Sequence, residues 1–385
     1  MQDQIKICVN LDLDYPIRRY QDLYSGIQKY ARQNNWTLIP DHYPEGIIRE
    51  KKCAYYDGMI GRIKHASYEE AKRYAIPVVN TWYNNDIKDI TSVLVDLKKC
   101  GVLAATHLIK RGFWNIALLD DPLEKGAKAF CEGVQEAVST TGGQLKVYPL
   151  CRTFNTSLDK WMESKRQLKS WCNEWEPPMG IVTSQCVCIP QIISQCAVHG
   201  FRIPKDVAFA VGDYEPSTCE GSSPTISAVN IDHIKLGYEA AKVLDMKMHG
   251  REPAQKATLV DCHSFTARES SDMYVFKDVL LKKSLRFIAD NFREGIQVAD
   301  VANHLGCSRR SLERRFLTYI GRGVADEINQ LRVEGLKKLL MESDQKINLL
   351  AVQSGFSSPA SMGRVFLRYE GLTPSEYRMS CKRVD

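Results

Sequence analysis

The order of apolar and polar positions changes in character about two thirds of the way along the chain. Up to about residue 265, short apolar runs alternate with longer segments in which apolar residues recur three and four positions apart. Short apolar runs are typical of strands buried on both faces, and the longer segments are typical of amphipathic helices. Beyond about residue 278 the strand-like runs disappear and the helical pattern remains. The pattern predicts an α/β part followed by an all-α part.

The α/β part is predicted to contain a parallel sheet covered on both faces, because strand and helix alternate along it. The predicted strands are the apolar runs at 5–11, 57–63, 76–82, 115–121, 179–184 and 206–213. The predicted helices lie between or after them, at 21–33, 67–75, 98–111, 126–141, 158–174, 187–199 and 232–248. Ligands of open α/β sheets bind beyond the carboxyl ends of the strands, so we expect a binding site there.

Two stretches of the α/β part carry a family resemblance. D-L-K-K-C-G-V-L-A-A-T-H-L-I-K-R-G-F-W-N-I-A-L-L (96–119) and G-F-R-I-P-K-D-V-A-F-A-V-G-D (200–213) resemble the sensor domains of the lactose-repressor family, which are periplasmic-binding-protein-like. The resemblance covers roughly residues 5–265. It implies two α/β lobes that close over a small ligand, usually a sugar.

The all-α part contains the sequence form of a helix-turn-helix twice. V-A-D-V-A-N-H-L-G (298–306) precedes C-S-R-R-S-L-E-R-R-F (307–316), with Gly306 suited to a left-handed helix end and Ser308 suited to cap the next helix. About fifty residues later, N-L-L-A-V-Q-S-G-F (348–356) precedes S-S-P-A-S-M-G-R-V-F (357–366). A long amphipathic stretch, 323–342, is predicted to connect the two units.

The two helix-turn-helix units, the helix that joins them and the residues after the second unit resemble the AraC family of transcription regulators over residues 278–385. The positions that match the family pattern are Gly355, Phe356, Ser358, Phe366, Gly371, Pro374, Tyr377 and Arg378. The chain departs from it at Ser361 and Met362, where the family usually has an aromatic pair. With the sensor resemblance, this implies an effector-sensing and dimerisation domain at 1–267, a linker at 268–277 and a double helix-turn-helix DNA-binding domain at 278–385. The order of a sensor domain followed by a double helix-turn-helix DNA-binding domain resembles that of a group of sugar-operon regulators.

The charge distribution agrees with a nucleic-acid partner for the last part. The formal net charge is +6, and residues 278–385 hold 18 Lys and Arg against 13 Asp and Glu. Almost all of the positive excess therefore lies in the predicted DNA-binding domain, as a polyanionic partner requires.

The second helix of each unit is predicted to lie in the major groove of DNA, with its early residues near the bases. In the first unit these are Arg309, Arg310, Glu313 and Arg314. Arg310 and Arg314 suit guanine, Glu313 suits the amino group of cytosine, and Arg315 suits phosphate. The second unit offers Ser358, Ser361, Arg364 and Arg368. We expect the first unit to supply most of the sequence discrimination.

The candidate effector-binding residues follow the predicted strands or come from the family resemblance. They are Tyr15, Arg18, Arg19, Arg62, Trp82, Lys128, Gln185 and Asp213. A sugar site needs hydroxyl acceptors, a planar donor and an aromatic plate. The resemblance assigns Asp213 to the family's ligand aspartate, and Tyr214 stands where relatives that bind pentoses tend to show Asn, which disfavours a pentose.

Other classes of protein lack support in the sequence. No secretory signal or run of 18 apolar residues is present, and the 13 scattered cysteines suit reduced thiols, so we expect a cytoplasmic protein. No nucleophile elbow, phosphate loop or H-x-x-x-H pair is found, so we expect no enzyme, metal or cofactor.

The expected partners are double-stranded DNA, a sugar-like effector, RNA polymerase and a second copy of the chain. Three alternatives remain: a sensor domain that only dimerises, a transport binding protein, and a sugar-modifying enzyme. The resemblance implies an activator of carbohydrate-utilisation genes that contacts RNA polymerase, while the residues themselves leave activation and repression open, as they do direct and inverted half-sites.

Overall fold

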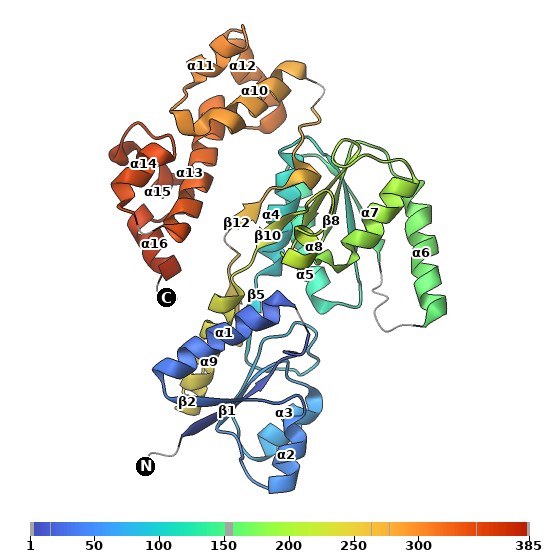
Figure 1. Cartoon of the computed structure of the whole chain (residues 1–385), viewed down its shortest axis with the longest axis vertical. Helices are drawn as coiled ribbons and strands as arrows, with labels where there is room; N and C mark the ends of the chain where they lie inside the picture. The colour runs from blue at the N-terminus through green and yellow to red at the C-terminus, as the bar shows by residue number, and fades with distance from the viewer. Residues whose placement is uncertain are drawn as a thin grey trace. The chain divides into compact units, whose positions relative to one another are not determined.

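A computed structural model describes residues 4–15, 17–150, 157–262, 264–276, 278–343 and 345–382. The chain forms two compact units (Figure 1). The first comprises Met1–Ile109 and Phe113–Met273, and the second comprises Lys110–Gly112 and Tyr274–Asp385. None of the helices in the described part of the chain has both the length and the apolar character of a membrane span.

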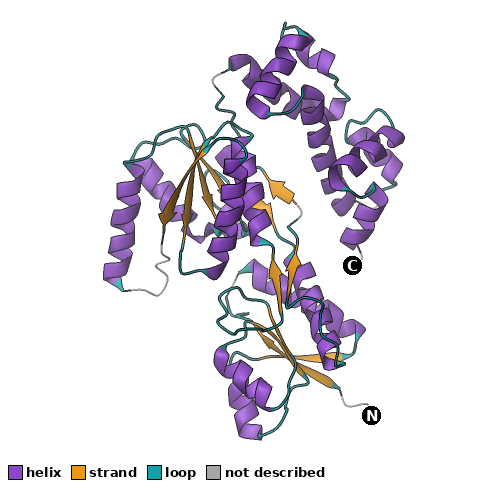
Figure 2. Ribbon diagram, turned by 180° about the vertical axis from the view of Figure 1, so that it is seen from behind, coloured by secondary structure: helices purple, strands orange, loops and turns teal. Residues whose placement is uncertain are grey.

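The first unit contains two six-stranded sheets, each the centre of one lobe (Figure 2). The first sheet has the order β11-β5-β4-β3-β1-β2 and is parallel throughout, with Ile7 opposite Leu38. Its strands are β1 (Ile5–Asn10), β2 (Trp36–Pro40), β3 (Gly58–Gly61), β4 (Val78–Asn80), β5 (Ser92–Val95) and β11 (Ala257–Val260).

The second sheet has the order β12-β10-β9-β8-β6-β7. All its neighbours are parallel except β12, which runs antiparallel to β10 with Thr266 opposite Ala228. Its strands are β6 (Asn115–Asp120), β7 (Gln144–Pro149), β8 (Met179–Thr183), β9 (Val207–Val211), β10 (Ser227–Asn230) and β12 (Ser264–Thr266).

Helices cover both faces of each sheet. The first lobe has α1 (Arg18–Gln33) and α9 (His233–Met248) on one face and α2 (Pro44–Lys51) and α3 (His65–Arg73) on the other. The second lobe has α4 (Leu97–Ile109) and α5 (Lys125–Ser139) on one face, and α6 (Leu158–Cys172) and α7 (Ile189–Val198) on the other. Short helices follow β8 (Cys186–Cys188), β9 (α8, Pro216–Cys219) and β12 (Glu269–Ser271).

One helix pair in each lobe packs at backbone distance. A Cβ at Gly26 of α1 would lie 1.9 Å from the carbonyl oxygen of Ile234 in α9. A Cβ at Gly133 of α5 would lie 1.9 Å from the carbonyl oxygen of Lys98 in α4. Only glycine permits so close an approach, so these residues fix the packing of the helix pairs over their sheets.

The chain passes between the two lobes three times. It crosses after β5, after β10 and after β11, because the strands on either side of these connections belong to different sheets. Neither lobe is a continuous segment of sequence. The predicted two-lobed, periplasmic-binding-protein-like α/β fold is confirmed.

The second unit is helical, as predicted (Figure 1). Its helices are α10 (Val279–Asn291), α11 (Val298–His304), α12 (Arg309–Ile320), α13 (Val324–Glu342), α14 (Ile347–Gln353), α15 (Pro359–Glu370) and α16 (Pro374–Lys382), with a short 3-10 helix at Phe292–Glu294. Leu285, Val301 and Phe316 belong to one buried cluster, and Leu350 and Phe366 belong to another. Helix α13 contributes to both clusters and so joins the two helix-turn-helix units.

The segment predicted as a linker, 268–277, is anchored at both ends. Ser270 and Ser271 are buried, and the Ser270 hydroxyl donates to the carbonyl oxygen of Phe209, 3.1 Å away. Phe276 is buried in the first cluster of the helical unit. Lys277 lies outside the described residues. Side-chain burial thus attaches Ser270 and Ser271 to the first unit and Phe276 to the second.

Candidate functional site

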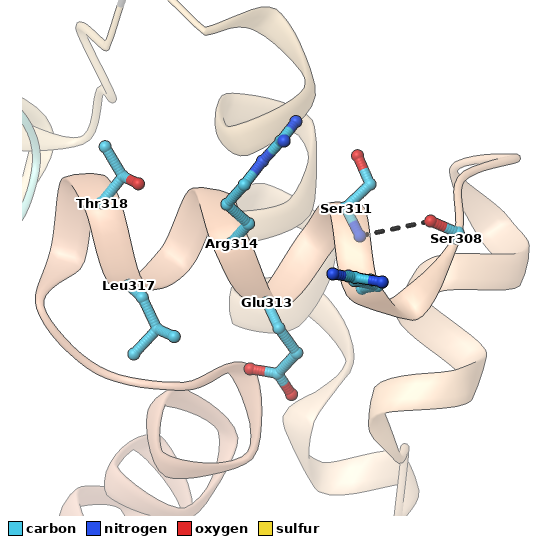
Figure 3. A pocket seen from close by; sticks show the side chains of 7 residues that line it. Ser308, Ser311, Glu313, Arg314, Leu317 and Thr318 are labelled. Carbon is cyan, nitrogen blue, oxygen red and sulfur yellow. Dashed lines mark hydrogen bonds between the residues drawn. The ribbon is translucent and has the colours of Figure 1, made fainter.

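Helix α12 presents cationic side chains that the rest of the helical unit leaves unpaired. Its first residue follows Ser308, whose hydroxyl accepts the backbone N–H of Ser311 at 3.2 Å (Figure 3). Arg309, Arg310 and Arg314 are exposed and form no ion pair within the described residues. Unpaired guanidinium groups at the start of an exposed helix are free to bind an anionic or hydrogen-bonding partner.

The same helix borders an open hollow on the surface of the unit. Figure 3 shows Arg314 and Thr318 on one side of the helix and Glu313 and Leu317 on the other. The hollow is lined by Ser308, Arg310, Ser311, Glu313, Arg314, Leu317 and Thr318. The sequence-predicted residues Arg310, Glu313 and Arg314 are therefore brought together on one surface.

Two charged side chains of α12 are bound within the unit. The Glu313 Oε2 atom accepts the backbone N–H of Val324 at 3.2 Å. The Arg315 Nε atom donates to Asp278 Oδ2 at 2.8 Å, and the same guanidinium donates to Ser311. Arg315 is therefore occupied by Asp278, which also caps α10 by accepting the N–H of Leu281 at 2.9 Å. Its expected role at phosphate receives no support from this geometry.

Helix α15 repeats the geometry of α12 with fewer cations. Ser358 caps it by accepting the N–H of Ser361 at 3.2 Å. Arg364 is exposed and has no ion-pair partner among the described residues, whereas Arg368 approaches Asp326 at 3.5 Å. Ser361 is half-buried, and Met362 is buried in the second cluster. Met362 thus fills the core where the family pattern has an aromatic residue.

The two helices correspond position by position at an offset of 50 residues. Both are capped by serine, both bury a phenylalanine, and both end at a glycine with a positive φ; the pairs are Ser308 and Ser358, Phe316 and Phe366, and Gly321 and Gly371. Arg314 corresponds to Arg364, but Arg310 corresponds to Ala360. The second helix therefore has one of the two arginines with which the first could reach bases.

In the first lobe, residues that follow three strands meet at the carboxyl edge of the sheet. Arg62, after β3, forms an ion pair with Asp12, after β1. The Arg62 guanidinium also lies over the ring of Trp82, after β4, with 4.3 Å between the guanidinium carbon and the ring centroid. Burial lowers the pKa of Arg62, and its buried Nε has no hydrogen-bond partner in the described part of the chain. The Arg62 Nε–H group is therefore a hydrogen-bond donor still without an acceptor, among the described residues, at this edge of the sheet.

In the second lobe, Asp213 follows β9 and is held by two cationic or potentially cationic side chains. Arg19 Nη1 of α1 approaches one carboxylate oxygen at 3.4 Å, and His233 Nε2 of α9 approaches the other at 3.4 Å. The Asp213 side chain is 15% exposed. Burial raises the pKa of Asp213, but the contacts with His233 and Arg19 outweigh it and hold the pKa below its usual range. Asp213 is therefore an ionised acceptor.

Polar contacts also join the loop 84–86 of the first lobe to the start of α5 in the second. The backbone N–H of Lys125 donates to Asn84 Oδ1 at 2.8 Å, and Lys125 Nζ donates to the carbonyl oxygen of Asn85 at 2.8 Å. Asn84 also contacts Glu124, and Lys125 forms an ion pair with Asp86. With Arg19 and Asp213, these contacts connect the lobes at two places.

The structure unites some of the predicted effector residues and separates others. Arg62 and Trp82 form one group, and Arg19 and Asp213 form another. The Oε1 atom of Gln185 is buried and has no partner among the described residues. The other three predicted residues do not join these groups within the described contacts: Tyr15 is 47% exposed, Arg18 pairs with Asp22, and Lys128 is exposed on α5.

His233 is a site residue that the sequence reasoning missed. It follows directly from the end of β10, at the same edge as Asp213, in N-I-D-H (230–233). The signal was its place after a strand. Tyr214, in contrast, turns to Glu220, whose Oε1 accepts its hydroxyl at 2.5 Å.

Family models match both parts of the chain. A helix-turn-helix domain model matches residues 301–380, and a periplasmic-binding-protein-like domain model matches residues 105–271. This chain is a DNA-binding transcription regulator with an AraC-type helix-turn-helix domain. Its domains are those of a regulator rather than an enzyme.

The regulator is similar to two curated relatives and to a solved structure. It is 23% identical to the xylose operon regulatory protein of Escherichia coli K12 over 368 residues, 93% of each chain. It is 24% identical to the protein of that name from Haemophilus influenzae over 221 residues, 57% of each chain. A solved structure of a xylose-binding transcription activator shares its fold with a TM-score of 0.59 and 20% identity, covering 97% of this chain and 98% of that one.

Proposed function

We propose that this regulator activates carbohydrate-utilisation genes in the cytoplasm in response to a sugar bound between the lobes of its first unit. The observation that carries the DNA-binding part is the first half of α12, where the exposed side chains of Arg309, Arg310 and Arg314 form no ion pair within the described residues. The relatives, a xylose operon regulatory protein and a xylose-binding transcription activator, support the sugar and the activation.

In this proposal the first helix-turn-helix unit reads bases. Arg310 and Arg314 donate pairs of hydrogen bonds to guanine, and Arg309 neutralises phosphate. Arg364 is the base-reading residue of the second unit, with Ser358, Ser361 and Arg368 at the DNA backbone. Glu313 lines the same hollow, but its carboxylate accepts the backbone N–H of Val324, so it is not one of the base-reading residues.

The sugar contacts follow from the polar groups at the carboxyl edges of the sheets. Asp213 accepts from hydroxyl groups, and Arg62 Nε and Gln185 Oε1 are buried groups for which a ligand would supply partners. The Trp82 ring carries Arg62 on one face, so a sugar stacks on its other face. Tyr15, Arg18 and Lys128 stay predictions. Because Tyr214 turns to Glu220, its presence carries no weight against a pentose.

Two further parts of the proposal concern assembly. The chain acts as a homodimer that places several recognition helices on one operator, and as an activator it contacts RNA polymerase. The second candidate function is a sensor unit that only dimerises. It is favoured by Gln185 and Cys186, because many members of the sensor family that this part resembles carry Asn and Asp at about these positions.

Calorimetry of the full chain against pentoses, hexoses and sugar acids, beginning with D-xylose, tests the proposal. We expect one sugar to bind and to change the affinity for DNA fragments selected from a random pool. Binding of selected DNA without response to any sugar would support the dimerisation role and overturn the sensing role.

A further inference from the structure

The helix that follows each recognition helix starts differently in the two units. Four backbone N–H groups at a helix start lack partners within the helix, and a side chain usually accepts one of them. Helix α16 starts after Thr373, whose hydroxyl accepts the N–H of Glu376 at 3.2 Å, while Glu376 Oε2 accepts the N–H of Thr373 at 2.8 Å. Helix α13 starts after Gly323, which has no side chain to accept anything.

Glu313 supplies the acceptor that Gly323 lacks. Its Oε2 atom accepts the N–H of Val324, the first residue of α13, at 3.2 Å, and lies 3.1 Å from the position that a Cβ of Gly323 would occupy. A carboxylate at a helix start also interacts favourably with the helix dipole. The acceptor therefore comes from the recognition helix α12 and ties the middle of α12 to the start of α13.

The second unit shows the complementary choice at the corresponding positions. Gly363 stands 50 residues after Glu313, and Thr373 stands 50 residues after Gly323. In the second unit the recognition helix has glycine at this position, and Thr373 caps the following helix α16. In the first unit the residue before α13 is Gly323, and the recognition helix supplies the carboxylate of Glu313 as the acceptor. In each unit a side chain thus accepts a backbone N–H at the start of the following helix, but it comes from the recognition helix only in the first unit.

We infer that Glu313 is a positioning residue, which sets α12 against α13, and that it does not read a base. The inference rests on the proposed binding of DNA through α12. Base discrimination in the first unit then belongs to Arg310 and Arg314, and Glu313 acts on it by fixing the helix that carries them. Loss of Glu313 weakens binding to all sequences and leaves the order of preference among them unchanged.

The test uses the full chain with Glu313→Ala, Glu313→Gln and the double variant Glu313→Ala with Gly323→Thr. Gly323 has extended backbone angles, φ −74° and ψ 164°, so a threonine can cap there. We expect Glu313→Ala to lower the Tm of the DNA-binding domain by roughly 4–8 °C and to speed exchange of the Val324 amide hydrogen. We expect the double variant to recover the Tm and the slow exchange of the Val324 amide. We expect Glu313→Gln to retain most of the Tm and of the slow exchange, because its amide oxygen can still accept the Val324 N–H.

Base preference is measured for each variant by selection from a pool of randomised operators. We expect the preference of Glu313→Ala and of the double variant to match that of the unchanged chain. A lost preference at one base position with unchanged Val324 exchange would overturn the inference, as would a double variant in which Tm and exchange are not recovered. Arg310→Ala is the control: if it too leaves preference unchanged, the proposed reading by α12 is wrong, independently of Glu313.

Discussion

Asp213 is the residue at which burial and charge oppose each other most clearly in the sensor unit. Its carboxylate stays ionised because His233 and Arg19 offset the cost of removing it from water. An ionised acceptor binds sugar hydroxyls more strongly than a neutral one. The ionised state of Asp213 therefore affects both the stability of the sensor unit at low pH and the binding of the proposed sugar.

The pH dependence of unfolding follows from the lowered pKa of Asp213. The unfolded carboxyl titrates near pH 3.9, and the folded one titrates below that. Its stabilising contribution is therefore complete above about pH 4 and is lost as pH falls through the folded pKa. We expect the difference in unfolding free energy between the unchanged chain and Asp213→Asn to shrink over that range, measured by urea titration of the sensor unit. A difference that stays constant with pH would contradict this.

The unequal recognition helices lead to a prediction about specificity. Arg310 corresponds to Ala360, so Arg310→Ala should remove discrimination that the second unit never had, at a cost of about 1–3 kcal/mol at one guanine. Arg364→Ala should cost less discrimination. Binding to single-base operator variants measures both. Equal loss of sequence preference in the two variants would show that the units read DNA equally.

The sequence was sufficient to predict which arginines of α12 are exposed, and insufficient to predict which side chains bind distant residues of the same chain. The exposed arginines of α12 follow from the capped helix and its spacing. The engagement of Glu313 and Arg315 depends on a backbone N–H 11 residues away and a carboxylate 37 residues away. No local pattern reveals such partners. His233 was missed for the same reason, because its partner Asp213 comes from another strand.

At the scale of elements, the two helix-turn-helix units differ in the turn between their helices. Four residues separate α11 from α12, and five separate α14 from α15. Both turns use a glycine with positive φ, Gly306 at 61° and Gly355 at 79°. A Cβ at Gly306 would meet nothing within 4 Å, whereas one at Gly355 would lie 2.1 Å from the carbonyl oxygen of Phe292.

Substitution of these glycines by alanine separates backbone strain from close packing. Gly306→Ala should cost about 1–2 kcal/mol of stability, the strain of a left-handed alanine. Gly355→Ala should cost roughly 2–5 kcal/mol, because the carbonyl of Phe292 must also move. Thermal unfolding of the helical unit measures both. Equal losses of stability in the two variants would mean that the Phe292 carbonyl moves away from the added methyl group without a loss of free energy.

The carbonyl of Phe292 is also held by a buried arginine of α13. Arg332 is 5% exposed and donates to the carbonyl oxygens of Phe292 at 3.0 Å and Ile296 at 2.7 Å. Its guanidinium carbon lies 5.9 Å from the centroid of the Phe356 ring, which belongs to the second helix-turn-helix unit. Arg332 and Gly355 therefore meet at one carbonyl and fix the second helix-turn-helix unit against the first.

Periodicity in the sequence was sufficient for about half of the strands and for most of the helices. The predicted strands and helices coincide with β1, β3, β4, β6, β8 and β9 and with the long helices, to within a few residues at their ends. Strands β2, β5, β7, β10, β11 and β12 were not predicted. The residues of β11 and β12 are half-exposed or exposed at sheet edges, except Val260, so these two strands lack a continuous apolar run. The lobe to which each strand belongs depends on hydrogen bonds to strands that are distant in the sequence, which a local pattern does not reveal.

At the scale of the whole sensor unit, the contacts between the lobes differ from those within them. Arg19 and Asp213 belong to different lobes and form a partly buried pair. Lys98 and Glu136 lie within one lobe and form an exposed pair at 2.8 Å. Pairs of the second kind contribute little to stability because water screens them.

Removal of these lysine and arginine side chains should therefore affect sugar binding unequally. We expect Arg19→Ala to weaken binding of the sugar found by calorimetry about tenfold, because it removes a donor to a buried carboxylate. Lys98→Ala should leave the affinity unchanged and is the matched control. An equal effect of both would mean that the contact between lobes does not contribute to binding.

The three passages of the chain between the lobes set the order in which the protein can be completed during synthesis. Helix α9, which packs on α1, and strand β11, which pairs with β5, come after five of the strands of the other lobe, β6 to β10. As the ribosome extends the chain, the first sheet lacks β11 until Val260 has been made, and the second lacks β12 until Thr266 has been made. Both sheets are therefore completed late, and a nascent chain that stalls before β11 exposes two incomplete sheets to chaperones and proteases.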